Sequence, residues 1–504
     1  MSVSRPFFPV QSLPLAMALA LLAGCAAVPD LGTRPEIRDA QSIDAQRSLE
    51  AQAIAWPDDK WWDAYSDPQL TALIEEGLRN APDMAIALAR FRQAQAMAQQ
   101  AGAPLLPSVD LNASAAATKQ SYNMGMPKEF IPQGWLGTGR VALDLGFDLD
   151  LWGKNKAALA AATSQARAAE LDGQQARLAL TTAIANAYAD LARLYDEADV
   201  QQRTLDIRMA SQKLVSDRRQ NGLETRGSVR QADATVSSAR AQLAGARMAI
   251  ELRQHQIAAL IGAGPDRGLS ITRRQKGKLT PLGLPADVTT NLVARRPDIA
   301  AALARTEAAA KRIKVARADF FPAVRLSALI GIQSLGYNTI FNSGGAVGSA
   351  QPFVNNLFEK DSLFGNAGPA ISLPIFRGGA LQASYRGARA TYDEAVASYD
   401  KTVLTAYQEV ADAVTSRRTL DLRLVDARAA LSASEDAYGI ARKRYEGGLS
   451  TYLDVLNVED QLLSTRRAVS DLEASAFSLD IALIRALGGG FVARDAQSKD
   501  QPHG

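Results

Sequence analysis

Long stretches of the chain alternate apolar and polar residues with the period of an α-helix. Residues 154–220 contain no proline and keep this period throughout, and at 1.5 Å per residue such a helix is about 100 Å long. Asn221-Gly222 ends it, and a second helical pattern covers 227–261. The same order returns later, with helices predicted over 379–445 and 451–487 around another glycine turn. Helices this long are typical of coiled coils and helical tubes.

Four shorter segments alternate with a period of two, which predicts β-strands with unlike faces. They cover 108–117, 140–149, 323–333 and 367–375, and they predict two hairpins, 108–149 and 323–376. One face of each is apolar, and the other carries the polar residues Asp110, Asp144, Asp148 and Arg325. About ten residues is the length of a tilted membrane-spanning strand. A sheet of a soluble protein with one solvent-exposed face gives the same alternation. The choice between a membrane-spanning sheet and a soluble one therefore depends on where the protein is located.

The chain is duplicated. Residues 82–90, which begin Pro82-Asp83, return 215 positions later as 297–305, and Gly222-Leu223 returns as Gly448-Leu449 at 226. Leu151-Trp152 resembles Ile375-Phe376 at 224. Each copy reads helix, strand, strand, long helices. Asp67, a candidate N-cap before Pro68, opens the first copy.

This order predicts an α+β chain divided into six segments. The segments are a leader over 1–24, an extended N-terminal segment over 25–66, a first repeat over 67–265, a linker over 266–284, a second repeat over 285–487 and a polar tail over 488–504.

Composition excludes several kinds of function. A net charge of +3 without a basic tract argues against nucleic acid. One cysteine and two histidines, His255 and His503, cannot build an intrachain disulfide or a Cys/His metal cluster. The sequence shows no nucleophile–base pair and no phosphate loop, so we expect neither an enzyme nor a bound cofactor.

The N-terminus reads as an export signal. The apolar stretch over 13–23 is too short to span a bilayer. It runs into Leu22-Ala23-Gly24-Cys25, which looks like a bacterial lipoprotein box and predicts acylation of Cys25. Ala26 stands where an aspartate would retain the protein at the inner membrane, so we expect an outer-membrane anchor. A cytosolic chain with a stray cysteine is the alternative.

An exported, anchored chain changes the interpretation of the strands. Four strands cannot close a barrel, and an open sheet edge is not tolerated in lipid. Closure needs at least about eight strands, so several chains must contribute. Twelve strands from three chains would surround a water-filled lumen lined by Asp110, Asp144, Asp148 and Arg325. Tyr122, Trp135 and Tyr337 in the hairpin loops would lie near the lipid headgroups.

The residues resemble a known family over nearly the whole mature chain. The strings that carry the resemblance are Arg295-Arg296-Pro297-Asp298-Ile299, Asp319-Phe320-Phe321-Pro322, Phe147-Asp148-Leu149-Asp150-Leu151-Trp152-Gly153, Pro374-Ile375-Phe376-Arg377-Gly378-Gly379 and Arg444-Tyr445-Glu446-Gly447-Gly448-Leu449. The chain resembles the TolC-like outer-membrane efflux proteins, in the lipoprotein branch that includes OprM and NodT. The resemblance implies a homotrimer with a 12-stranded barrel and a helical periplasmic tube. It also implies a periplasmic adaptor and an inner-membrane exporter of the proton-driven RND type as partners.

The resemblance further implies a periplasmic gate near the second glycine turn. The acidic ring of the family corresponds to Asp454, its next acidic position to Asn457, and its latch tyrosine to Tyr445. The aspartate that receives this tyrosine in some members falls at Ser228, and an arginine of this turn falls at Ser450; both are departures. The ends of the helical hairpins, at Gly222, Leu223, Gly448 and Leu449, would meet the adaptor.

The function predicted is a passive exit duct of a tripartite efflux system. Two alternatives stay open from the sequence. One is the outer-membrane channel of a type I protein secretion system. The other is a structural periplasmic lipoprotein without a pore, which the four alternating strands disfavour.

Overall fold

The structure is a computed structural model. It describes residues 28–39, 42–51, 53–123, 125, 127, 130–131, 133–273, 284–334 and 357–493. The leader, Cys25, Tyr337, most of the linker and the end of the tail with His503 lie outside the described residues.

The chain forms two compact units, and each draws on both repeats. The first, here called the strand unit, comprises the described residues within 1–35, 93–166 and 305–395. The second, the hairpin unit, comprises those within 36–92, 167–304 and 396–504. The repeats predicted over 67–265 and 285–487 are therefore units of sequence that do not coincide with the compact units.

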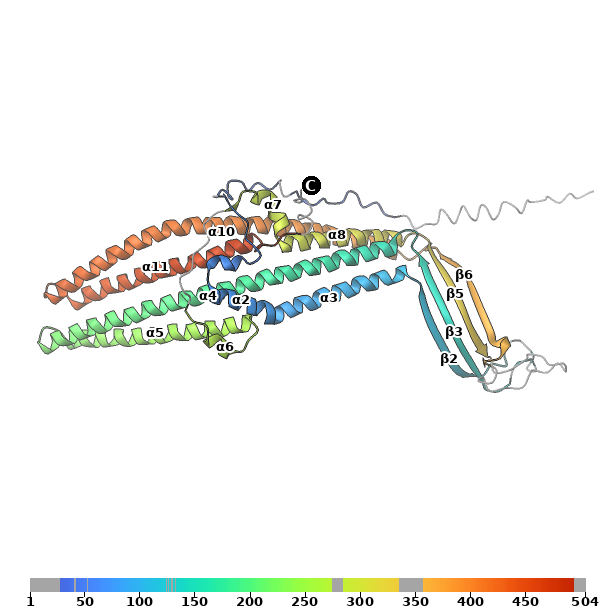
Figure 1. The fold of residues 1–504 in the computed structure, drawn as a ribbon, viewed down its shortest axis with the longest axis horizontal. Coiled ribbons are helices and arrows are strands. Elements are labelled where there is room, and N and C mark those ends of the chain that lie inside the picture. Colours follow the sequence, from blue (N-terminus) through green and yellow to red (C-terminus); the bar gives the residue numbers. More distant parts are fainter. Residues whose placement is uncertain are drawn as a thin grey trace, which may run out of the picture. The chain divides into compact units, whose positions relative to one another are not determined.

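Four strands of the strand unit form one antiparallel sheet in the order β2-β3-β5-β6 (Figure 1). They are β2 (Ser108–Thr118), β3 (Leu136–Leu149), β5 (Ala323–Ser334) and β6 (Leu363–Ser372). The two predicted hairpins are present and pair with each other through β3 and β5. β6 begins four residues earlier than predicted and stops before Leu373 and Ile375. β2 and β6 are the edges of the sheet in the single chain, and Pro369 lies within β6.

The helices follow the predicted pattern closely. α2 (Pro68–Asn80) begins after Asp67, whose carboxylate accepts from the N–H groups of Gln69 and Leu70, and α3 (Pro82–Gly102) begins at the next proline. α7 (Val288–Arg295) and α8 (Pro297–Ala318) repeat this break at Pro297. Within the described residues, none of the helices combines the length and the apolar character that crossing a bilayer would need.

The long helices of the two repeats match in length. α4 (Lys154–Gln220) and α10 (Ala380–Glu446) have 67 residues each, and α5 (Arg226–Leu260) and α11 (Tyr452–Ala486) have 35 each. Both pairs are displaced by 226 positions, which pairs Gly153 with Gly379, each with positive φ directly before its helix. The structural equivalent of Trp152 is therefore Gly378, two positions beyond the sequence likeness to Phe376.

The hairpin unit has its largest core where the short and long helices meet. Trp62 and Tyr65 of η2 (Trp61–Tyr65) pack with Ile184 of α4 and Phe477 of α11. Short elements that the sequence did not predict include α6 (Pro265–Leu269), and β1 (Ala53–Ile54), which pairs in parallel with β4 (Leu284–Pro285). In the predicted tail, Gly488 and Gly489 are buried.

Candidate functional site

The polar residues predicted on the strands share one face of the sheet. Asp110 of β2 lies directly opposite Asp144 of β3. The Asn112 amide donates to Asp144 across the same pair of strands, with Nδ2 and Oδ2 2.7 Å apart. Two carboxylates at one level give this face a local negative charge, and the neighbouring amide holds one of them in place.

The predicted basic residue of this face pairs with its last acidic one. Asp148 of β3 lies opposite Arg325 of β5, with Nε 3.8 Å from the carboxylate Oδ1. The guanidinium lies over Gly146, where an added Cβ would come within 2.4 Å of Arg325 Nη2. A glycine at 146 therefore makes room for the arginine. Both side chains stay more than half exposed.

The opposite face of the sheet is apolar and uncovered in the single chain. The register places the odd-numbered residues of β2 and β3 and the even-numbered residues of β5 on this face. Its exposed large side chains are Val109, Leu111, Leu143, Leu145, Leu326, Ile330, Leu363 and Ile371. Such a contiguous apolar surface marks a site of contact with lipid or protein.

The two helical hairpins end in turns with the same backbone. The Leu223 N–H donates to the Arg218 carbonyl and the Leu449 N–H to the Arg444 carbonyl. Gly222 and Gly448 adopt φ of +75° and +74°, which a side chain would strain. Leu223 and Leu449 are 63% and 74% exposed. Each hairpin thus presents one leucine at its end.

The helices that leave these turns are capped alike, but their carboxylates come from different positions. Thr451 caps α11, and the Asp454 carboxylate accepts from the Thr451 N–H and hydroxyl in a reciprocal capping box. Thr225 caps α5 through the Ser228 N–H, and position 228 has no carboxylate to return. Both bonds from Thr451 lower the pKa of Asp454, with help from the positive charge of Arg444.

Asp454 and Asn457 are both exposed in the single chain. The structure thus gives Asp454 a local role at the start of α11, beside the role that the resemblance implies.

Tyr445 is buried, and it joins the two hairpins. Its hydroxyl donates to the Glu224 carboxylate at 2.8 Å, and Arg218 lies over its ring with the guanidinium carbon 4.6 Å from the centroid. The resemblance led us to Ser228 as the position that receives the tyrosine, and the acceptor is instead Glu224, one turn earlier. Burial raises the pKa of Tyr445, and the bond to the Glu224 carboxylate raises it further, so the phenol stays protonated.

Glu224 accepts the hydrogen bond that a capping-box carboxylate at position 228 would accept. It accepts from the Thr225 N–H at 3.0 Å and from the Ser228 hydroxyl at 2.8 Å, in addition to Tyr445. Burial alone would raise its pKa, but these three bonds and the positive charge of Arg218 outweigh burial, and the net pKa is lowered. Glu224 is therefore an anion shared by both hairpins.

A second contact between the hairpins is a buried ion pair that the sequence analysis missed. The Arg208 guanidinium on α4 lies 2.8 Å from Glu459 Oε1 on α11, and the two side chains are 9% and 1% exposed. The Ser211 hydroxyl donates to Glu459 Oε2 at 2.8 Å, and Arg208 also contacts Asp460. Burial raises the pKa of Glu459, while Arg208 and Ser211 act in the opposite direction.

One signal in the sequence could have revealed this pair. Val455, Leu456, Leu462 and Leu463 form the buried stripe of α11, and Glu459 lies at the centre of that stripe. A charged residue at a core position needs a partner. Glu224, by contrast, gives no such signal, because it lies on a turn outside any apolar stripe and its partner Tyr445 is 221 residues away in the sequence.

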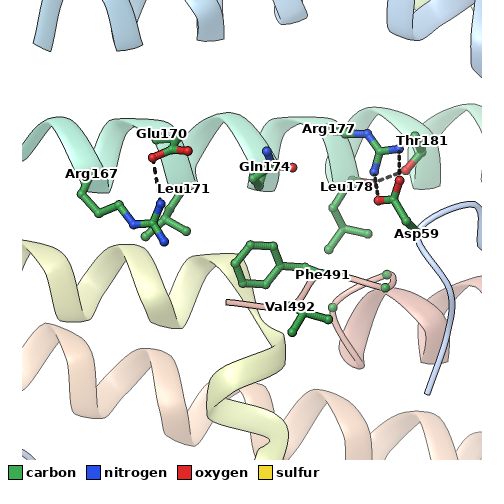
Figure 2. A pocket seen from close by; sticks show the side chains of 13 residues that line it. Asp59, Arg167, Glu170, Leu171, Gln174, Arg177, Leu178, Thr181, Phe491 and Val492 are labelled. Carbon is green, nitrogen blue, oxygen red and sulfur yellow. Dashed lines mark hydrogen bonds and ion pairs between the residues drawn. The ribbon is translucent and has the colours of Figure 1, made fainter. Parts of the chain in front are cut away.

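A pocket of ≈ 310 Å³ lies beside α4 in the hairpin unit (Figure 2). Its two arginines are both paired: Arg167 with Glu170 at 2.9 Å, and Arg177 with both oxygens of Asp59 at 2.6 and 3.0 Å. The turn at Gly488–Gly490 forms part of its wall. None of the site residues predicted from the sequence is among its lining residues, and the paired charges indicate a structural contact.

Known proteins are similar to this one over most of its length. Residues 73–263 and 288–489 match the family described as outer membrane efflux protein. The fusaric acid resistance protein FusA of Burkholderia cepacia is 34% identical, over 75% of this chain and 68% of that protein. The pyoverdine export outer membrane protein OpmQ of Pseudomonas aeruginosa is 31% identical, over 86% and 87%. The crystal structure of the outer membrane protein VceC of Vibrio cholerae is 43% identical, with a TM-score of 0.76 over 86% of this chain and 100% of that one.

Proposed function

The chain belongs to the outer membrane efflux protein family, and from this premise we propose that it is the exit duct of a tripartite efflux system. It conducts substrates passively from a periplasmic adaptor and an inner-membrane exporter of the RND type to the cell exterior. The observation that carries this proposal is the two-faced sheet, with exposed apolar side chains on one face and charged residues on the other. A duct of this kind needs no chemistry of its own, in keeping with a family of transport proteins.

The assembly that we propose is a homotrimer. A sheet with open edges at β2 and β6 cannot reside in lipid, because each unpaired backbone group costs several kcal/mol there. Three copies give a closed sheet of twelve strands, with the apolar face towards lipid. Asp110, Asp144, Asp148 and Arg325 then face the lumen, where water can solvate them.

The substrates that we propose are small molecules. Fusaric acid resistance, pyoverdine export and multidrug resistance are the roles that the names of relatives state, among them MdtP of Escherichia coli, which is 28% identical over 94% of this chain. These names favour small-molecule efflux over secretion of a polypeptide, which was the alternative from the sequence.

The anchor that we propose is acylated Cys25. Arg389 of α10 donates to the carbonyls of Gly32 and Thr33, and the Tyr392 hydroxyl donates to the Pro35 carbonyl at 3.2 Å. These bonds hold the start of the described chain against the first turns of α10, which follows β6 directly. A lipid seven residues before Gly32 is therefore within reach of the membrane that the sheet would occupy.

Mass spectrometry of the mature native protein tests the anchor. We expect acyl chains on Cys25, and we expect Cys25→Ser to fold normally while losing them. An unmodified Cys25 in the native protein contradicts the anchor and leaves the channel untouched.

The gate that we propose lies at the ends of the hairpins. Three copies of Asp454, with Asn457 one turn further, would form a ring that attracts cations and repels anions. Tyr445 would hold the hairpins closed through Glu224. Leu223 and Leu449, each next to its glycine at 222 or 448, offer the adaptor two matched apolar contacts.

Conductance in planar bilayers tests the channel. We expect the purified trimer to pass small currents, and Asp454→Ala to reduce its preference for cations over anions. Asn457→Ala is the matched control, since it changes an exposed side chain of the same helix without changing charge. A folded protein that forms no trimer and passes no current, even with Asp454→Ala, would overturn the proposal.

A further inference from the structure

The internal duplication determines how two copies of the sheet can join. The sheet has two open edges, one along β2 and one along β6. All eleven residues of β2 and nearly all of β6 are exposed. Both edges leave backbone N–H and C=O groups without ladder partners on their outer side, so each is a template for pairing with another strand.

The two β-hairpins of one chain follow the same rule for strand pairing. β5 repeats β2 at a displacement of 215 positions, as Pro82 and Pro297 do, and the segments from β3 and β6 onwards are displaced by 226, as Lys154 and Ala380 are. Applied to the pair Leu111↔Leu143 of the first hairpin, these displacements give Leu326↔Pro369. That pair is observed in the second hairpin.

The same rule applies to the junction between the hairpins. β3 pairs with β5, so the equivalent junction joins β6 to β2 of a neighbouring copy. We propose that this junction forms in one register, in which Ile371 lies opposite Ala113 of the neighbouring copy. The register follows from the observed pair Leu145↔Ala328. It rests on the proposed function, because it takes a second copy of this chain as the occupant of each edge.

The side chains on both strands agree with this register. Apolar positions meet apolar ones, with Ile371 and Pro369 opposite Ala113 and Ala115 of the neighbouring copy. On the other face, Ser372 lies opposite Asn112 and Ala370 opposite Ser114. A slip by one residue would place Ile371 opposite a polar side chain and bring the faces out of agreement. A slip by two residues keeps the faces and has to be separated by experiment.

This register also explains why β6 ends three residues before the predicted end at Ile375. β3 has partners on both sides and continues to Leu149, whose equivalent is Ile375. β6 has one partner and ends at Ser372. With a neighbouring β2 in place, the strand extends to Ile375, and Leu373 lies opposite Leu111. Val109, Leu111 and Ile375, all more than half exposed in the single chain, then become part of a continuous sheet.

Paired cysteines test the register directly. The chain has one cysteine, so Cys25→Ser provides a background without thiols. In it, Ala370→Cys with Ser114→Cys places two thiols opposite each other on the polar face, and Ile371→Cys with Ala113→Cys does so on the apolar face. The matched controls are Ala370→Cys with Asn112→Cys and Ile371→Cys with Leu111→Cys, each shifted by two residues. Single-cysteine variants report the background.

We expect oxidation to yield a covalent trimer from both matched pairs, at least about tenfold more than from the shifted pairs, because opposite residues have Cβ atoms within about 5.5 Å and diagonal ones do not approach so closely. Using two faces guards against one variant that fails to fold. Cross-linking that is strongest in the shifted pairs overturns the register and leaves the trimer standing. Folded variants that stay monomeric and form no cross-link overturn the register together with the proposed assembly.

Discussion

The ends of the two helical hairpins are copies with the same backbone and different chemistry. Both turn through a glycine at positive φ, and both are followed by a threonine cap. At the second hairpin Asp454 completes the cap within its own helix. At the first, the equivalent residue is Ser228, and the carboxylate comes from Glu224 before the cap.

This difference has a consequence for how the hairpins interact. Asp454 uses one oxygen on its own threonine and contacts only its own hairpin in the bonds described above. Glu224 uses one oxygen on its own turn and the other on Tyr445 of the second hairpin. The two copies therefore share the turn but carry the carboxylate at different positions, and only the carboxylate of Glu224 bridges the two helical hairpins.

The largest effect is expected from the buried pair deeper between the hairpins. Arg208→Ala leaves the Glu459 carboxylate buried without its cation, and we expect the free energy of unfolding to fall by about 3–5 kcal/mol. Denaturant unfolding followed by helical circular dichroism measures this. The control is Arg428→Ala, which removes an exposed pair with Glu473 within the second hairpin and should cost about 0–1 kcal/mol. Equal losses in the two variants would contradict a buried, desolvated Arg208–Glu459 pair.

A smaller effect is expected from the bridge at the hairpin ends. Tyr445→Phe keeps the ring under Arg218 but removes the hydroxyl that donates to Glu224, and we expect the contact to weaken by about 1.5–3 kcal/mol. The channel should then open more often in bilayers. A double-mutant cycle with Glu224→Gln isolates the pair. Strictly additive effects in this cycle would show that Tyr445 and Glu224 act independently.

Acid should weaken this bridge, and the buried pair should respond in the opposite direction. The pKa of Glu224 is lowered from its ordinary 4.5, so its contribution to stability is present above pH 4.5 and is lost as the pH falls through the lowered pKa. The pKa of Glu459 is raised from 4.5, so its contribution is fully present below pH 4.5 and is lost as the pH rises through the raised pKa.

Unfolding free energies measured against pH check both signs. The advantage of the wild type over Glu224→Gln should shrink as the pH falls. The unfolding free energy of the wild type relative to that of Glu459→Gln should fall as the pH rises. Two curves with the same slope would be incompatible with a half-buried carboxylate whose pKa is lowered by its hydrogen bonds and a buried carboxylate whose pKa is raised.

The smallest effect is expected from the caps themselves. Thr225→Ala and Thr451→Ala each remove the hydroxyl that caps a helix, and each should cost about 1 kcal/mol. In both variants the backbone N–H of the capping residue still donates to a carboxylate, that of Glu224 in the first hairpin and that of Asp454 in the second. We therefore expect equal losses, measured as faster hydrogen exchange in the first turns of α5 and α11. Unequal losses would mean that the position of the carboxylate matters to the cap.

Much of the fold could be predicted because local signals were strong. Pro82 and Pro297 fix helix starts, Gly222 and Gly448 fix turns, and the alternation of β2, β3 and β5 fixes the faces of the sheet. The bounds of β6 were wrong because a strand ends where its partners end. Pairing depends on tertiary neighbours that a local pattern does not contain.

The site was predicted less completely than the fold. The strand residues Asp110 and Asp144 were placed on one face because alternation alone determines that. The partner of Tyr445 was not found, because any polar residue near the first turn could have reached it and only the packing of the two hairpins selects Glu224. Whether Asp454 and Asn457 form a ring stays a prediction, since it depends on copies of the chain.

The equal lengths of the long helices constrain how this protein can evolve. One residue inserted into α4 alone would advance Gly222 by about 1.5 Å and rotate it by about 100° relative to Gly448. That rotation would take Glu224 away from Tyr445 and Arg208 away from Glu459 in a single step. We therefore expect changes in helix length to be tolerated best as matched pairs, one in each copy, because only these keep the ends of the two helical hairpins level with each other.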